Sequence, residues 1–370
     1  MRFLFYLITI VPLILLWSCG KDEPSSPTDN FNRQSMLMHW ADNYIIPGYT
    51  AYAQATHELS VAATEFSADR NLNTLNNLRT KWLAAYSVWQ RVSMLEVGPA
   101  AELNLRNNTN VYPVDTEGIH ANITAGDANL ELPSNFDRQG LGALDYLLYG
   151  VADSEQAILA FYTEGVAGAD ATTYLQRLAL RLDALAQHVL AAWQSNGYRE
   201  EFIANDGSSA NAAVDQFTNA FVFYYEKALR AGKVGIPAGV FSGSPLPTHV
   251  EAPYYGQNKQ FLQGALNAFA DFFNGKSFHG DLSGPSYRQY LEELQAAKEG
   301  THIAQLINDQ FAASRAKIEA LHTELAQQIQ DDNQAMLATY DELQRNVVLL
   351  KVDMLQAMSI AVTYVDADGD

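Results

Sequence analysis

The segment that decides the fold is Arg138-Gln139-Gly140-Leu141-Gly142-Ala143-Leu144-Asp145-Tyr146-Leu147-Leu148-Tyr149-Gly150, which holds one carboxylate inside an apolar run. Its leucines recur at steps of three and four residues, as on one face of a helix. Gly150 is a suitable residue to end that helix. Asp145 is adjacent to this face, and burying an ionised carboxylate alone is costly. We therefore expect Asp145 to be paired, or to bind a ligand or a cation.

The same helical spacing of apolar residues recurs along the rest of the chain. It is clear in residues 75–92, 175–189, 318–329 and 336–354, whose narrow apolar seams are typical of helices packed in bundles. Extended alternation of apolar and polar residues, the mark of a half-buried strand, is hard to find. The sequence therefore predicts an all-α protein.

Two long segments interrupt the helical pattern. Residues 98–140 contain Asn and Pro turns, and residues 232–256 are rich in Gly, Pro and Ser. Loops of this length inside a compact helical protein are usually functional or packed. We expect both segments to contribute to a functional region.

The charge and the cysteine content exclude several classes of protein. The 370 residues carry a net charge of −19, which argues against a protein that binds nucleic-acid phosphates. Cys19 is the only cysteine, so no intramolecular disulfide and no cysteine-based zinc site can form. No H-E-x-x-H, Walker or G-x-S-x-G motif occurs in a suitable context.

The N-terminus predicts a location in the cell envelope. Residues 1–18 begin with a positive charge, continue with an apolar run too short to span a bilayer, and resemble a lipoprotein signal peptide. Leu16-Trp17-Ser18-Cys19 resembles a lipobox, so Cys19 is the expected lipidation site and the lipid the expected membrane anchor. Residues 19–30 are expected to form a flexible tether. Their acidic start resembles the export signal of surface lipoproteins of Bacteroidetes, which favours an outer-membrane lipoprotein and leaves its periplasmic or surface face open.

The Asp145 segment resembles the G-x-H-x-x-E signature of the imelysin family, but in a degenerate form. Gly140 matches the motif glycine, whereas Gly142 stands at the histidine position and Asp145 at the glutamate position. Imidazole and carboxylate together can hold a divalent metal and activate its water, the chemistry of a metallopeptidase. Without the histidine, one carboxylate is too few ligands for such a site, so an enzyme is disfavoured.

The resemblance extends over nearly the whole chain after the tether. It includes Ile45-Ile46-Pro47-Gly48-Tyr49, residues 82–99, Tyr112-Pro113-Val114-Asp115, and residues 233–239 with Glu251. Within residues 82–99, Tyr86 occupies a family arginine position, and Glu96 lies one turn after a frequent glutamate position. Family membership implies two four-helix-bundle-like halves, here residues 31–205 and 206–370, with the ligand region at their junction.

Further residues are candidates for this ligand region. Lys227, Arg230 and Lys233 form a cationic patch that could accept carboxylates or ferric-chelate oxygens, and Lys227 or Arg230 is the preferred partner of Asp145. An ion pair with Glu226 is the simpler role for Lys227. Glu96 and Glu251 are candidates through the family motifs.

A weaker metal site is conceivable in the first long loop. Asp115, Glu117 and His120 cluster there and could bind a cation, although a polar turn is the better explanation for them.

Three hypotheses on function remain. The first is a membrane-anchored protein that binds iron or haem, because imelysin-like proteins are associated with iron acquisition; a TonB-type receptor or another iron-uptake protein would then be its partner. The second is a metallopeptidase, which the missing histidine disfavours. The third is a scaffold for an envelope protein. The long loops and the aromatic helix around residues 221–225 favour the first.

Overall fold

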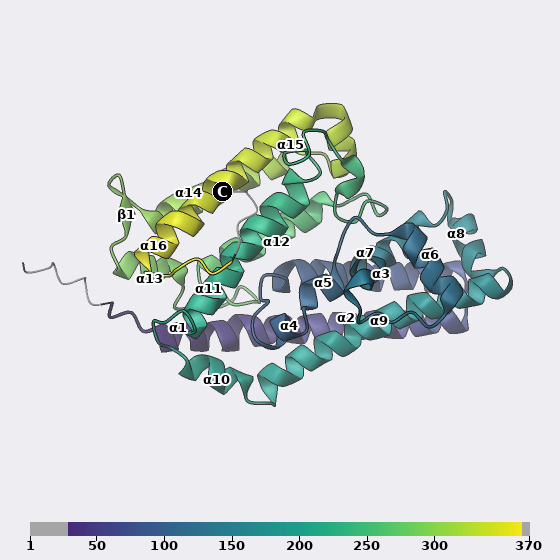
Figure 1. The fold of residues 1–370 in the computed structure, drawn as a ribbon, viewed down its shortest axis with the longest axis horizontal. Coiled ribbons are helices and arrows are strands. Elements are labelled where there is room, and N and C mark those ends of the chain that lie inside the picture. Colours follow the sequence, from purple (N-terminus) through teal and green to yellow (C-terminus); the bar gives the residue numbers. More distant parts are fainter. Residues whose placement is uncertain (1–28, 365–370) are drawn as a thin grey trace, which may run out of the picture. The chain divides into compact units, whose positions relative to one another are not determined.

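The computed structural model describes residues 29–364, and from Phe31 onward the chain forms one compact unit. The predicted signal peptide, the lipidation site Cys19 and all but the end of the tether lie outside the described residues. Figure 1 shows the arrangement of the helices in the compact unit. No helix among residues 29–364 has the length and apolarity needed to cross a bilayer.

The first part of the unit is built from long helices with short ones between them. Its elements are α1 (Arg33–Trp40), η1 (Ala41–Ile45), α2 (Ile46–Ala68), α3 (Leu72–Val92), α4 (Pro99–Glu102), α5 (Leu105–Thr109), α6 (Thr116–Ala125), η2 (Pro133–Arg138), α7 (Gly140–Asp145), η3 (Tyr146–Gly150), α8 (Glu155–Thr163), α9 (Gly165–Gln194) and α10 (Tyr198–Ala204).

The second part is also helical, with one minimal strand pair. Its elements are α11 (Ala213–Phe223), η4 (Tyr224–Gly235), η5 (Pro247–His249), α12 (Lys259–Phe273), α13 (Tyr287–Glu293), β1 (Ala297–Lys298), β2 (Thr301–His302), α14 (Ile303–Glu319), α15 (Leu325–Val348), η6 (Leu349–Met354) and α16 (Leu355–Ala357). The strands are antiparallel, with Ala297 opposite His302. Helices η1, η3, η4 and η6 are π-helices, and η2 and η5 are 3₁₀-helices. The all-α prediction is confirmed.

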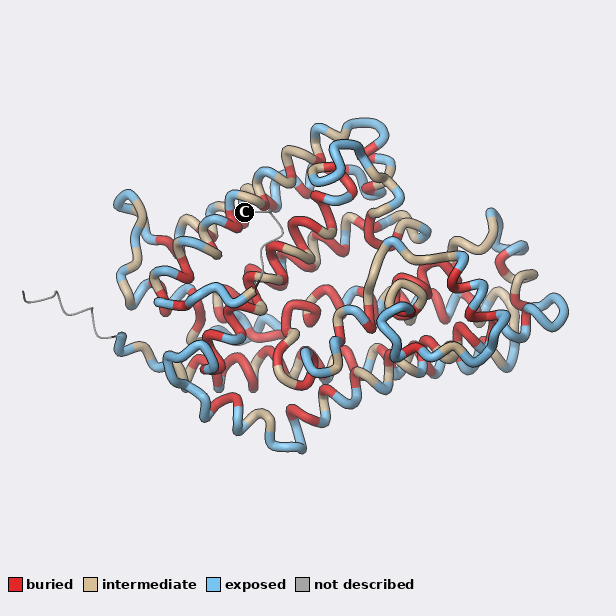
Figure 2. The backbone as a smooth tube through the Cα atoms, in the orientation of Figure 1, coloured by how far each residue is buried: buried red, intermediate tan, exposed pale blue. Residues whose placement is uncertain are grey.

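In the first part, α2 packs along α3 and α9. Helix α3 begins at a capping box in which the Asn71 side chain accepts from the Thr74 amide, while the Thr74 hydroxyl accepts from the Asn71 amide. Its apolar stripe, which includes Leu78 and Trp82, is buried. Figure 2 shows buried stretches, coloured red, along the inner faces of the helices.

In the second part, α12 and α15 pack against η4, which continues α11, and α14 packs against both α12 and α15. Phe221 of α11 stacks on Phe269 of α12 with ring centroids 3.7 Å apart, and Phe311 of α14 meets the edge of Phe269 at 5.9 Å. Aromatic pairs of this kind stabilise a core beyond the area they bury.

The two parts share one core instead of forming separate units. Helices α1, η1 and α2 run on without a break from Arg33 to Ala68, and the N-terminal end of this helix lies against the second part. There Trp40 contacts Phe217, Phe272 and Tyr287 at centroid distances of 4.8 to 5.2 Å. Helix α3 packs on α12 further along the same junction. The division at residue 205 stays a prediction.

Both long interruptions in the helical pattern are folded. The first contains α4, α5, α6 and η2. The second is helical up to Gly235 and then runs through turns to Val250, which is fully buried. The segment that follows, residues 250–256, lies against the first part of the molecule, and we call it the docking segment.

Candidate functional site

Asp145 ends α7 at the junction, and its side chain holds the docking segment. The carboxylate is fully buried. Its two oxygens accept hydrogen bonds from the backbone amides of Tyr254, at 3.1 Å, and Tyr255, at 2.9 Å. The Tyr254 ring contacts Tyr146 at 5.2 Å, and the Tyr255 ring contacts Tyr149 at 5.5 Å. Asp145 is therefore paired, as expected, but with main-chain donors.

The prediction that Lys227 or Arg230 pairs with Asp145 is wrong. Neither Lys227 nor Arg230 forms an ion pair with Asp145, because both lie beside Glu226. Burial raises the pKa of the Asp145 carboxyl to about 7, and the charge of Glu251 adds to that rise, while the two amide hydrogen bonds lower it. Desolvation is the largest of these effects because the carboxyl group is fully buried, and no cation within residues 29–364 is paired with it to offset the rise.

Gly140 and Gly142 leave the space that the backbone packed on α7 needs. Gly140 has φ +75°, and a Cβ there would lie 2.2 Å from the carbonyl oxygen of Thr109. A Cβ on Gly142 would lie 2.8 Å from the carbonyl oxygen of Val111 and 3.1 Å from Val114. The chain around residue 111 therefore fills the space in which a histidine side chain would have to begin.

Glu251, at the start of the docking segment, is held in a different way. It is buried and forms an ion pair with Lys233, which is buried as well. Its Oε1 accepts from the Gln90 amide at 3.0 Å and from the Asn110 amide at 2.8 Å. Lys233 also donates to the Gln90 carbonyl oxygen at 2.7 Å. Burial lowers the pKa of the Lys233 ammonium, and the charge of Glu251 opposes this shift.

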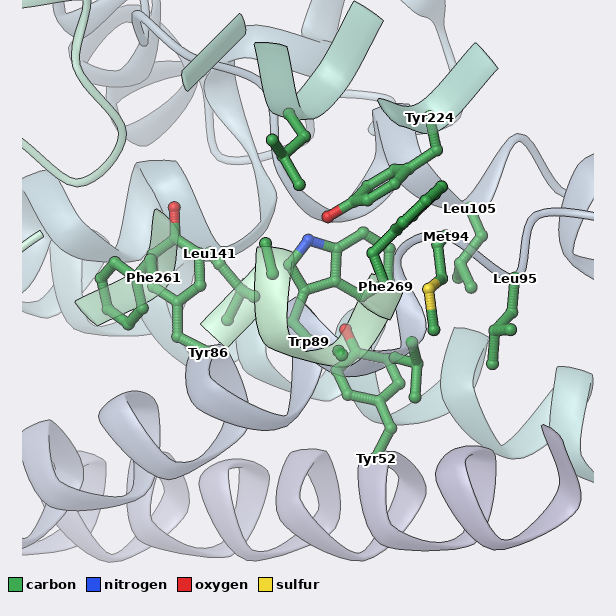
Figure 3. Packing of buried hydrophobic residues seen from close by; sticks show 14 of the residues in the cluster. Tyr52, Tyr86, Trp89, Met94, Leu95, Leu105, Leu141, Tyr224, Phe261 and Phe269 are labelled. Carbon is green, nitrogen blue, oxygen red and sulfur yellow. The ribbon is translucent and has the colours of Figure 1, made fainter. Parts of the chain in front are cut away.

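This cluster contains two residues that the sequence did not single out, Gln90 and Asn110. Tyr86, at the family arginine position, donates to the Asn110 side-chain oxygen at 2.7 Å. Its ring stacks on Phe261 with centroids 4.3 Å apart, and Figure 3 shows this packing next to Trp89. Amide side chains have no motif of their own, so no spacing in the sequence could have identified Gln90 or Asn110.

A cavity of about 220 Å³ opens beside the Glu251 cluster. It lies between α3, the segment after α5, and η4, and we call it the junction cavity. Polar and aromatic groups line it, among them Gln90, Asn110, Arg106, Tyr112, Tyr224 and Lys233. The Tyr224 hydroxyl accepts a hydrogen bond from Ser93 at 3.0 Å. Tyr224, from the aromatic helix, therefore faces the junction cavity.

The rest of the cationic patch surrounds a buried carboxylate in the second part. Glu226 is fully buried, with the Lys227 ammonium 3.5 Å and an Arg230 nitrogen 3.8 Å from its Oε1. Lys351 lies 3.1 Å from its other oxygen. Arg230 also donates to the Tyr340 hydroxyl at 2.6 Å. The patch is therefore divided, because Lys233 belongs to the junction cavity and the other two cations belong to Glu226.

Glu96 does not face Asp145. Its Oε2 pairs with Arg106 at 3.0 Å, and its Oε1 accepts from the Arg106 backbone amide at 2.8 Å. Arg106 in turn donates to the Ser93 carbonyl oxygen at 3.1 Å. Glu96 thus holds Arg106 in place, and through Arg106 it influences the junction cavity.

The loop candidates for a metal site are separated by their own partners. Asp115 caps α6 through the Gly118 amide at 2.9 Å and pairs with Arg138 at 2.9 Å. Donation from Gly118 holds the pKa of Asp115 below its ordinary value, with help from Arg138. His120 bonds the Tyr146 hydroxyl at 2.7 Å. Within residues 29–364, no three His, Cys, Asp or Glu side chains are placed to hold a metal together, Glu117 included.

Comparison with known proteins agrees with this architecture. Iron-regulated protein A of Synechococcus elongatus is 21% identical over 332 residues, which cover 85% of each chain. A crystal structure of an imelysin-like protein from Psychrobacter arcticum superimposes with a TM-score of 0.68 at 20% identity, covering 90% of this chain and 97% of the other. A Parabacteroides distasonis structure, described as an iron-regulated protein A precursor, gives 0.71 at 16% identity, covering 90% and 96%.

The family model carries the assignment, because it spans the long helices and the whole junction. The model described as imelysin matches residues 45–350, a range that includes α7, η4 and the docking segment. The chain therefore belongs to the imelysin family.

Proposed function

We propose that this protein is an iron-linked binding component of the cell envelope, and that the junction cavity is its ligand site. The observation that carries the proposal is the lining of the cavity, where Lys233 and Arg106, each paired with a glutamate, place N–H donors next to the amide groups of Gln90 and Asn110. Relatives named iron-regulated protein A support the link to iron.

The chemistry of the lining favours an oxygen-rich anion. Guanidinium and ammonium groups bind carboxylate oxygens through charge-assisted hydrogen bonds. At about 220 Å³ the cavity is smaller than the 300–1,000 Å³ typical of sites for drug-sized ligands. A small ferric chelate with carboxylate groups suits these dimensions better than haem does.

Peptidase activity is the disfavoured alternative. Gly142 supplies no nitrogen ligand, and the carboxylate of Glu251 is engaged by Lys233. An open zinc site needs three protein ligands and a water. We expect purified protein to show no chelator-sensitive peptide cleavage that depends on Asp145.

Binding can be tested by thermal unfolding with ferric citrate, iron-free citrate and haem. A ligand at 100 times its Kd stabilises the folded state by about 2.7 kcal/mol. We expect ferric citrate to raise the Tm of the wild type. The double variant Lys233→Gln and Glu251→Gln should remove that rise. Both charges of the pair are removed together, so that neither is left buried and unpaired. Lys276→Gln, an exposed lysine paired with Asp271, is the control.

A wild type that responds to none of the three probes contradicts the proposed ligand class and favours the scaffold. A response to haem alone, lost in the double variant, would instead assign haem to the cavity.

Membrane attachment through a lipid on Cys19 is part of the same proposal. Two observations in cells test it: Cys19→Ser should move the protein from the membrane to the soluble fraction, and the wild type should incorporate a labelled acyl chain. Retention of the variant in the membrane would contradict the anchor. An outer-membrane position beside a TonB-type receptor would fit a role in iron uptake, and crosslinking in cells under iron limitation tests that partner.

A further inference from the structure

A second cavity lies on the other side of Gln90 from the junction cavity. It has a volume of about 290 Å³ and is bounded by the end of α3, by α12, and by the turn at residues 277–280. Gln90 lines both cavities and is only 2% exposed, because its amide is held by Glu251 and Lys233. The two cavities are therefore separate, and we call this one the α3–α12 cavity.

Arg91 brings an unneutralised positive charge to this cavity. Its guanidinium lies over the Phe278 ring, 3.7 Å from the centroid, and one terminal nitrogen donates to the Phe278 carbonyl oxygen. Within residues 29–364 no carboxylate lies within 4 Å of Arg91, and the Tyr44 hydroxyl, which also lines the cavity, is a second acceptor for its guanidinium. A guanidinium has five N–H donors, so most of its donor capacity stays open.

The acidic residue that shares the cavity already has a cation of its own. Asp271 pairs with Lys276 at 2.7 Å. Asn267, also in the lining, accepts from Arg315 through its side-chain oxygen, which leaves its NH₂ group as a further donor towards a ligand. The cavity thus combines one uncompensated cation with neutral donors.

We infer that the α3–α12 cavity binds a small oxyanion, with Arg91 as the main contact. The planar fork of a guanidinium matches carboxylate and phosphate oxygens in a bidentate arrangement. Stacking on Phe278 fixes the plane of the fork and reduces the entropy lost on binding. In a protein with a net charge of −19, general attraction does not draw anions in, so binding depends on this local arrangement. The inference does not rest on the function of the junction cavity.

Isothermal titration of the full mature protein tests the site, with inorganic phosphate and succinate as probes in sodium chloride of matched ionic strength. We expect saturable binding of at least one probe, weakened at least tenfold in Arg91→Gln. Arg91→Lys keeps the charge but not the planar fork, so its affinity should lie between those of the wild type and Arg91→Gln. Arg288→Gln, an exposed arginine paired with Glu292, is the matched control and should bind as the wild type does.

A second variant keeps the test valid if Arg91→Gln is poorly folded. Asn267→Asp replaces the NH₂ donor in the lining with a second carboxylate oxygen, leaves the contact between Arg91 and Phe278 untouched, and should weaken binding even though Arg315 can pair with the new carboxylate. Binding of phosphate alone or succinate alone identifies the class of oxyanion. No saturable binding of either probe to the wild type, or binding to Arg91→Gln and Asn267→Asp that is as tight as to the wild type, overturns the inference. The double variant of Lys233 and Glu251 should bind both probes normally, which separates this site from the junction cavity.

Discussion

Two carboxylates at the junction, Asp145 and Glu251, are both buried but are stabilised by different groups. Glu251 has a cation, Lys233, and two side-chain amides. Asp145 has two backbone amides and no cation. The charge of Glu251 is therefore neutralised by a neighbour, whereas that of Asp145 is most easily neutralised by a proton, which is why its pKa rises to about 7. In this chain the degenerate motif holds the docking segment in place, and the charged groups of the cavity lie elsewhere.

The largest effect is expected at the Glu251 cluster. Lys233→Met leaves a buried carboxylate without its cation and should lower the free energy of unfolding by about 3–5 kcal/mol. Adding Glu251→Gln should recover much of that loss. Lys276→Met, in an exposed pair, should cost less than about 1 kcal/mol in the same urea titrations. Equal losses for the two lysine variants would mean that the buried pair is no more important than a surface pair.

A smaller loss is expected at Asp145. Asp145→Ala removes the acceptor for the amides of Tyr254 and Tyr255, and leaving such donors unsatisfied costs about 1–3 kcal/mol each. Since both groups are only partly buried, we expect about 2 kcal/mol in total. Hydrogen exchange should speed up at these two amides and much less at the amides of α2. Unchanged exchange at Tyr254 and Tyr255 would show that Asp145 does not hold the docking segment.

The smallest effect, when it is measured per pH unit, separates the two carboxylates by the pH dependence of stability. The folded pKa of Asp145 is raised from 3.8 to about 7, so the folded state binds its proton more tightly than the unfolded state does. This group's contribution to stability is full below pH 4 and is lost as pH rises to 7, by at most about 1.4 kcal/mol per pH unit. Asp145→Asn should lack this pH dependence, so its free energy of unfolding should rise relative to that of the wild type between pH 5 and 8.

Glu251→Gln should not reproduce that gain over the same pH range. Parallel stability curves for wild type and Asp145→Asn would contradict the proton-neutralised state of Asp145.

The sequence predicted the fold well because apolar spacing is a local signal. The stripe from Leu75 to Val92 lies on α3, as the sequence predicted. The burial of Asp145 was predicted for the same reason, since it is adjacent to Leu144 on a buried face. Which cations of the patch share a face was harder to predict, because η4 is a twelve-residue π-helix. Its i→i+5 hydrogen bonds change which side chains share a face.

The partners within the site could not be predicted. The amides of Tyr254 and Tyr255 are more than a hundred residues from Asp145, and a backbone donor has no sequence signature. Glu251 and Lys233 were both candidates, but their pairing depends on how residues 236–250 fold back. The packing of Val111 against Gly142 explains why glycine suits the motif position, and only the three-dimensional structure shows that contact.

The unbroken helix from Arg33 to Ala68 also has a consequence for the order of folding. It leaves the ribosome before the second part of the chain does, yet Trp40 packs against Phe272 and Tyr287, which are made more than 200 residues later. Contacts this distant in sequence slow folding and delay its completion. The N-terminal turns of this helix therefore keep an exposed tryptophan until most of the chain has been synthesised. A nascent chain in that state is open to chaperones, which act before the native core closes.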